Sequence, residues 1–82
     1  MNIYCIHDKK AETYETIFCL PNNAYAIRSF QEAVNKDTPY GNYPEDFELV
    51  QLGEYNQETG KLEALPSPAI LIQATDLKTE KK

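Results

Sequence analysis

The sequence is poor in the residue types from which metal sites are usually built. Its 82 residues include one histidine and two cysteines, and tryptophan is absent. The spacing of Cys5, His7 and Cys19 matches no zinc finger, and a fourth ligand would have to be a carboxylate. We therefore expect no metal site. Both cysteines lie in apolar runs, so we predict that they are reduced thiols in the core and that His7 is a surface residue at a strand end.

The same scarcity argues against catalysis. Ser29 and Ser67 have no evident base, and a single histidine does not make a catalytic triad. Glu45 and Asp46 are adjacent, so on an extended chain they point apart and do not form an acid–base pair. With only three glycines, the chain also has no glycine-rich phosphate loop. These absences predict a binding protein without a cofactor rather than an enzyme.

Long hydrophobic runs are missing as well. The opening "MNIYCIHDKK" has neither the basic start nor the apolar stretch of a secretory signal. No run approaches the roughly 20 apolar residues that span a bilayer. We expect a soluble intracellular protein without a membrane partner.

Basic residues are few, and this limits the kind of partner. Thirteen acidic residues against eight basic ones give a net charge of −5. A strongly cationic nucleic-acid binder is therefore excluded, although aromatic stacking and local patches can bind single strands on an acidic background. The length predicts one domain, and a domain this small buries only about 60% of its unfolded surface. We expect self-association, as a homodimer, to add core.

The hydrophobic pattern predicts an α+β fold. Residues 2–7 and 14–20 are typical of strands, and residues 21–37 have apolar positions at helical spacing after a cap at Asn22 or Asn23. Residues 38–46 are predicted to form a loop. Strand 47–55, a turn that needs Gly60, and a return over 61–65 make a hairpin. A break at 66–68 and a strand at 69–74 follow. The predicted order is β-β-α-β-β-β, a small antiparallel sheet with one helix on one face. The domain covers residues 1–76 and a charged tail covers 77–82.

Exposed aromatic and basic residues are the remaining functional signal. The chain has six tyrosines. Several could form a surface for stacking on single-stranded bases, which is worth about 1–3 kcal/mol per base. Alternatively, these tyrosines are half-buried in strands or in a subunit interface, which is an equally good explanation of their number. The candidate residues are Tyr4, Tyr14, Tyr25 and Tyr55, with Lys9, Lys10 and Lys61 nearby.

Arg28, the only arginine, has two interpretations. It could contact a phosphate or a partner, or it could form an ion pair with Asp46 that holds the loop against the helix. We favour the ion pair. An Arg28→Ala variant would then lower the melting temperature and leave partner binding nearly unchanged.

Several short motifs together resemble a known family. "YCIHDKKAETY" is similar to a family opening of the form Y-S-x-x-D-x-K-A, and "CLPNNAYAIRSF" to its ND-x-x-A-x-R-x-F helix start. "YPEDFELVQLGEY" resembles the strand PED-[FY]-x-L-x-x-[LI]-GE-[FY], and "NQETGKL" the turn D-x-x-TG. On these motifs the chain resembles the small nonstructural protein of gokushoviruses, which are single-stranded DNA microviruses. The likeness covers most of the chain and weakens after Leu65.

The resemblance implies a function and a location. Proteins of that family are described as nonstructural and DNA-binding, acting in the switch from double-stranded replication to single-stranded genome synthesis. It therefore implies a protein of the host-cell cytoplasm that is not part of the virion. Its partner would be single-stranded DNA, or alternatively a host or phage replication protein that it modulates without touching DNA. The family supplies no catalytic residues that could be transferred to this chain.

Overall fold

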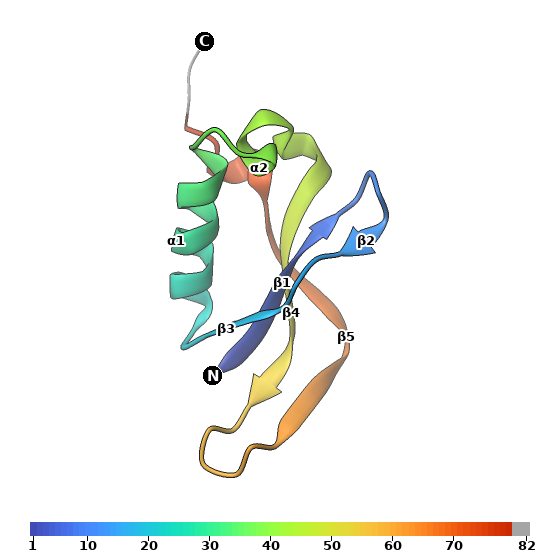
Figure 1. The fold of residues 1–82 in the computed structure, drawn as a ribbon, viewed down its shortest axis with the longest axis vertical. Helices are drawn as coiled ribbons and strands as arrows, with labels where there is room; N and C mark the ends of the chain where they lie inside the picture. Colours follow the sequence, from blue (N-terminus) through green and yellow to red (C-terminus); the bar gives the residue numbers. More distant parts are fainter. Residues whose placement is uncertain (80–82) are drawn as a thin grey trace.

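The protein forms one antiparallel sheet with helices packed against it. The structure, a computed structural model, describes residues 1–79. The strands are β1 (Asn2–Asp8), β2 (Thr13–Tyr14), β3 (Phe18–Leu20), β4 (Phe47–Tyr55) and β5 (Leu62–Gln73). The helices are α1 (Asn23–Val34), α2 (Pro39–Asn42), the 3-10 turn η1 (Pro44–Asp46) and α3 (Ala74–Leu77). The sheet order is β2-β1-β4-β5, and β3 also pairs with β1 (Figure 1). The α+β class is confirmed.

β1 is central, and both of its faces are covered. Tyr4 and Ile6 belong to the core on the side of α1, together with Phe30 and Leu49. Because side chains alternate along a strand, Cys5 points to the opposite face, where it is also fully buried. The hydrophobic run "NIYCIH" therefore reflects a strand that is buried on both faces. It lies inside the sheet, between β4 on one edge and β2 and β3 on the other.

The predicted second strand is divided in two. β2 pairs with the end of β1 at His7 and Asp8, whereas β3 pairs with its start at Asn2, Ile3 and Tyr4. Between them the Glu15 N–H donates to the Ile6 carbonyl of β1 at 2.9 Å, and the Glu15 carboxylate accepts a hydrogen bond of 2.6 Å from the Tyr40 hydroxyl. β2 and β3 thus lie one after the other along the same edge of β1.

α1 forms where the periodicity predicts it, but it is not the only helix. The Asn22 side chain caps α1 by accepting from the Tyr25 N–H, and Ala26, Phe30 and Val34 form the buried stripe. The predicted loop contains α2 and η1, each of which starts at a proline. Proline suits the first turn of a helix because its missing N–H would have no partner there. Segments of three or four residues are too short to show helical periodicity.

The β4–β5 hairpin is longer than predicted. Gly60, with a φ of 77°, closes the turn as expected, and its N–H donates to the Asn56 carbonyl at 2.7 Å. The prediction that residues 66–68 break the chain is wrong, because they lie within the twelve-residue strand β5. Prolines are tolerated there because β5 is an edge strand and its pairing with β4 is irregular between Gln51 and Gly53. The observed order is therefore β-β-β-α-α-η-β-β-α.

The helices and the C-terminal segment complete one side of the core. α3 contributes Ala74 and Leu77, which pack with Phe47 and the buried residues of α1. Leu77, which the sequence analysis placed in the tail, is the last residue of α3 and is buried. Two further tail residues contact the end of α1: the Lys78 ammonium donates to the Val34 carbonyl, and the Thr79 N–H donates to Asn35 Oδ1. Residues 80–82 of the predicted tail lie outside the described residues. Cys19 was predicted to be buried, but it is exposed on β3.

Candidate binding surfaces

One predicted contact residue lies in the core. Tyr4 is fully buried, so its ring has no free face on which a base could stack. Its hydroxyl donates to Asn23 Oδ1 at 2.6 Å and accepts from the Asn2 amide at 3.0 Å. The prediction that Tyr4 belongs to a stacking surface is therefore wrong. A tyrosine in a central strand is held by packing, and its polar end is satisfied locally.

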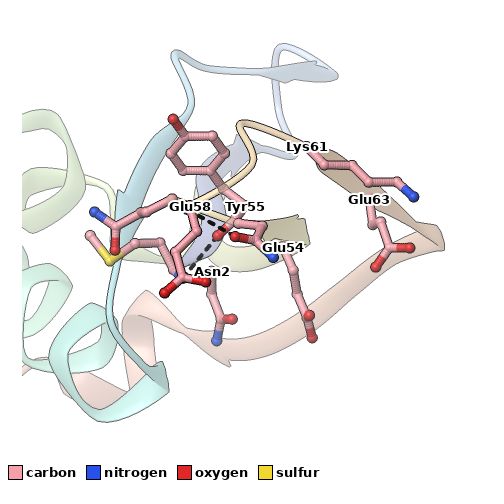
Figure 2. A pocket seen from close by; sticks show the side chains of 9 residues that line it. Asn2, Glu54, Tyr55, Glu58, Lys61 and Glu63 are labelled. Atoms are coloured by element: carbon pink, nitrogen blue, oxygen red, sulfur yellow. Dashed lines mark hydrogen bonds between the residues drawn. The ribbon is translucent and has the colours of Figure 1, made fainter.

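Tyr55 and Lys61 line a groove at the turn end of the β4–β5 hairpin. The groove has a volume of about 640 Å³ and is bounded by the first two residues of the chain, β4, the turn and β5. Figure 2 shows the side chains that surround it, including Glu54 from β4, Glu58 from the turn and Glu63 from β5. The amino group of Met1 donates to the Tyr55 carbonyl at 3.1 Å. Three carboxylates against Lys61 and one amino group make this groove acidic.

Lys9, Lys10 and Tyr14 lie where β1 turns into β2. Tyr14 is half exposed, and one face of its ring stacks on His7 at a centroid distance of 4.1 Å. The Lys9 ammonium donates to Gln73 Oε1 at 2.7 Å. Lys10 is exposed, and its N–H donates to the Asp8 carboxylate that organises the turn. Two of these three side chains therefore already have partners within the domain.

A charged network beside this turn is a feature that the sequence analysis missed. His7 Nδ1 lies 2.7 Å from Glu48 Oε2, and the Gln73 amide donates to Glu48 Oε1 at 2.8 Å. Glu48 is only 5% exposed. Burial alone would raise the pKa of Glu48, but the hydrogen bonds from His7 and Gln73 and the charges of His7 and Lys9 together lower it. The network joins β1, β4 and β5. Only the register of these strands brings the three side chains together, and the register cannot be derived from the sequence.

The lowered pKa of Glu48 predicts a loss of stability in acid. Because the pKa is lower in the folded than in the unfolded protein, the unfolded chain binds more protons near pH 4. The contribution of Glu48 is therefore present above its unfolded pKa, which is near the ordinary value of 4.5, and is lost as the pH falls through its folded pKa. Urea unfolding at neutral pH and at acid pH measures this change. We expect Glu48→Gln to lose part of the pH dependence, and an unchanged dependence would contradict the assignment.

Tyr25 and Arg28 lie together on the exposed side of the first turns of α1. Asn22, Ala24, Tyr25 and Arg28 line a shallow hollow of about 260 Å³. Tyr25 is 54% exposed, and Arg28 is also exposed. Their spacing of three residues places them on neighbouring positions of one helix face. The hollow therefore combines an aromatic ring, a guanidinium and a polar cap side chain.

The predicted ion pair of Arg28 is wrong. Among residues 1–79 the one ion pair joins His7 to Glu48, and Arg28 is not part of any. Asp46 is at the end of η1, where its carbonyl accepts from the Lys9 N–H at 2.8 Å. We therefore reverse the expectation for Arg28→Ala and predict an unchanged melting temperature. The sequence gives no signal for which loop would lie beside Arg28.

The family of the chain can now be stated from comparison with known proteins. A family model described as Phage ORF5 protein matches residues 1–77. The chain belongs to the Phage ORF5 family. No curated protein and no solved structure matches it at a significant level.

The family match confirms the phage origin that the resemblance implied. It extends over every helix and strand from β1 to α3, so all three surfaces lie within the Phage ORF5 region. In the described part of this Phage ORF5 protein no helix is long and apolar enough to cross a membrane. No group of three histidine, cysteine or acidic side chains suited to a metal ion occurs among residues 1–79.

Proposed function

We propose that this Phage ORF5 protein is a nonstructural accessory protein of phage DNA replication that binds single-stranded DNA. It would act in the host cytoplasm, outside the virion, as a binding protein and not as an enzyme. The hollow at the start of α1 is the proposed contact surface. The observation that carries the proposal is that Tyr25 and Arg28 are both exposed, adjacent on the helix, and not engaged by a carboxylate within residues 1–79.

Charge and exposure favour this hollow over the other two surfaces. The groove at the hairpin end places Glu54, Glu58 and Glu63 around Tyr55, and these carboxylates would repel a phosphate backbone. At the β1–β2 turn Tyr14 offers only one ring face, because His7 covers the other. In the hollow the Tyr25 ring can stack on a base while the Arg28 guanidinium takes the adjacent phosphate in a bidentate contact.

The overall acidity of the chain sets the expected form of binding. With a net charge of −5, few phosphates can be neutralised. The slope of log affinity against log salt should therefore be shallow, roughly −1 to −3, at about −0.7 for each phosphate contact with a single strand. Stacking must supply much of the affinity, and a duplex hides its base faces. Single strands should thus bind more tightly than duplex.

We predict that Tyr25→Ala weakens binding to a labelled oligothymidylate by roughly 5- to 150-fold, the equivalent of losing one stacked base at about 1–3 kcal/mol. Arg28→Gln should weaken binding and make the salt slope shallower by about 0.7, with the melting temperature unchanged. Fluorescence anisotropy at two salt concentrations measures both effects.

Two matched variants serve as controls for this experiment. Tyr43→Ala removes a tyrosine that is as exposed as Tyr25 but lies at the end of α2, and Lys61→Gln removes a cation from the acidic groove. Neither should change the affinity. If wild-type protein does not bind at low salt, the DNA proposal is rejected. If Lys61→Gln weakens binding more than Arg28→Gln, the location in the hollow is wrong.

The acidic groove supports a second candidate function, the modulation of a replication protein without DNA contact. Its three carboxylates and its volume of about 640 Å³ suit a basic segment of a partner protein. A lysine-rich peptide would then bind wild-type protein, with an affinity that falls when Glu54 and Glu63 are changed to glutamine. The same two substitutions would leave the affinity for an oligonucleotide unchanged.

A further inference from the structure

The Asn22 side chain lines the hollow at the start of α1 with one of its two polar atoms already engaged. Its Oδ1 accepts from the Tyr25 N–H at 3.0 Å. This bond fixes the orientation of the amide, because an N–H group can pair only with the oxygen. The nitrogen lies on the other side of the same carbon and is directed away from that N–H. Within residues 1–79 the Asn22 Nδ2 has no hydrogen-bond partner, so its two N–H donors are available to a ligand.

The four residues that line this hollow offer hydrogen-bond donors and few acceptors. The Asn22 carbonyl accepts from the Ala26 N–H at 3.2 Å. The carbonyls of Ala24, Tyr25 and Arg28 lie inside α1, where each accepts from the N–H four residues further on. The guanidinium of Arg28 can only donate, and the Tyr25 hydroxyl can donate or accept. The hollow therefore suits a ligand group that itself accepts hydrogen bonds.

Three of the lining residues follow one another along the helix. Asn22, Tyr25 and Arg28 are three residues apart, which places them at neighbouring positions of one face. At a rise of about 1.5 Å per residue, the outer two are separated by about 9 Å along the axis, with Tyr25 between them. In the proposed function, on which this inference rests, Tyr25 stacks on a base and Arg28 holds the adjacent phosphate. The base edge farthest from that phosphate then lies at Asn22.

We propose that the Asn22 amide selects bases that carry an oxo group at this edge, so that the hollow binds thymine and guanine in preference to cytosine and adenine. Thymine presents its O4 atom there and guanine its O6 atom, and both accept a hydrogen bond from Nδ2. Cytosine and adenine present an amino group at the same place, which would set donor against donor. Asn22 is thus a specificity-determining residue, and the ligand is single-stranded DNA rich in oxo bases.

The cap bond is what gives Asn22 this preference. An asparagine whose two polar atoms are both free pairs with adenine in a bidentate contact, in which the oxygen accepts from the amino group and the nitrogen donates to the ring. At Asn22 the bond to the Tyr25 N–H occupies the oxygen and removes this option. The same hydrogen bond therefore starts α1 and restricts the side chain to the role of a donor.

Two oligonucleotides that differ at this edge test the proposal by fluorescence anisotropy at neutral pH. One is oligothymidylate, and the other has 5-methylcytosine at every position, with the same ring size and methyl group but an amino group in place of O4. Wild-type protein should bind oligothymidylate roughly 3- to 10-fold more tightly, the equivalent of one neutral hydrogen bond. Equal affinities would overturn the selection by Asn22 and leave the proposed DNA binding intact. Binding to neither at low salt would reject both proposals.

Variants of Asn22 keep the helix cap and change only the group that meets the base. Serine and aspartate are N-caps as good as asparagine, so the melting temperature should stay close to that of the wild type. Asn22→Ser should abolish the preference for oligothymidylate. Asn22→Asp replaces the donors by an acceptor, so it should reverse the preference, while its charge weakens binding to both oligonucleotides.

Two further variants identify the residue that selects the base. Tyr25→Phe keeps the ring and removes the hydroxyl, and the ratio of the two affinities should remain that of the wild type. Asn23→Ser removes the neighbouring amide, which does not line the hollow, and should change neither the affinities nor their ratio. A preference that survives Asn22→Ser, or that either of these two variants abolishes, would overturn the assignment to Asn22.

Discussion

Tyr4→Ala is expected to lower the free energy of unfolding by about 3–5 kcal/mol, the range found when a buried aromatic side chain is removed. The Tyr4 side chain is fully buried in the core on the side of α1, and its ring lies 6.0 Å from that of Phe18. Its removal leaves a cavity between β1, β3 and α1. For a domain of this size the loss is a large share of the total stability. Urea unfolding at neutral pH measures it.

Two further variants separate the ring of Tyr4 from its hydroxyl. Tyr4→Phe keeps the ring and removes the hydroxyl with its bonds to Asn23 and Asn2, so we expect a loss of about 1–2 kcal/mol. Tyr25→Ala removes an exposed tyrosine from the nearby helix and should change stability by less than about 0.5 kcal/mol. If Tyr4→Ala destabilised no more than Tyr25→Ala, the assignment of Tyr4 to the core would be wrong.

Gly53→Ala is expected to destabilise the protein at or above the upper end of the about 1–3 kcal/mol found for overpacking. A Cβ at position 53 would lie 2.2 Å from the Glu63 carbonyl oxygen and 3.0 Å from the Ala64 Cα. Both atoms belong to the backbone of β5, so the clash cannot be relieved by a change of rotamer. The two strands would have to separate where their pairing is already irregular. Chemical denaturation again measures the effect.

Gly60 is the matched control in the same hairpin. A Cβ at Gly60 has open space around it, so a substitution there is limited only by the φ of 77°. Asparagine tolerates this conformation, and Gly60→Asn should cost less than about 1 kcal/mol. Equal losses for Gly53→Ala and Gly60→Asn would show that the close approach of β4 and β5 does not determine stability.

The sequence predicted the elements whose signal is local. α1 has a three-to-four-residue apolar period and an asparagine cap, and both are found in the structure. The hairpin turn at Gly60 follows in the same way from the need for a positive φ. The short segments α2, η1 and α3 were missed because three or four residues cannot show a period. β5 was wrongly divided because prolines are excluded from central strands but not from an edge.

The exposure of the candidate residues depended on long-range pairing and was therefore less predictable. Residue type identified Tyr25 and Arg28 as separate candidates, and the structure places them beside the same hollow. Residue type alone could not separate Tyr25 from Tyr4, because exposure depends on which strand is central. The His7–Glu48 pair joins positions 41 residues apart, and only the register of β1 and β4 brings them together.

The most direct test of the account is a nuclear magnetic resonance titration of isotope-labelled protein with unlabelled oligothymidylate. It reports binding and its location in a single experiment. The account predicts chemical-shift changes centred on residues 22–28, at the start of α1, with little change at residues 54–63. The Tyr25→Ala variant should show the same shifts only at higher DNA concentration. Shifts centred on residues 54–63, or none at low salt, would contradict the proposal that this Phage ORF5 protein binds single-stranded DNA through Tyr25 and Arg28.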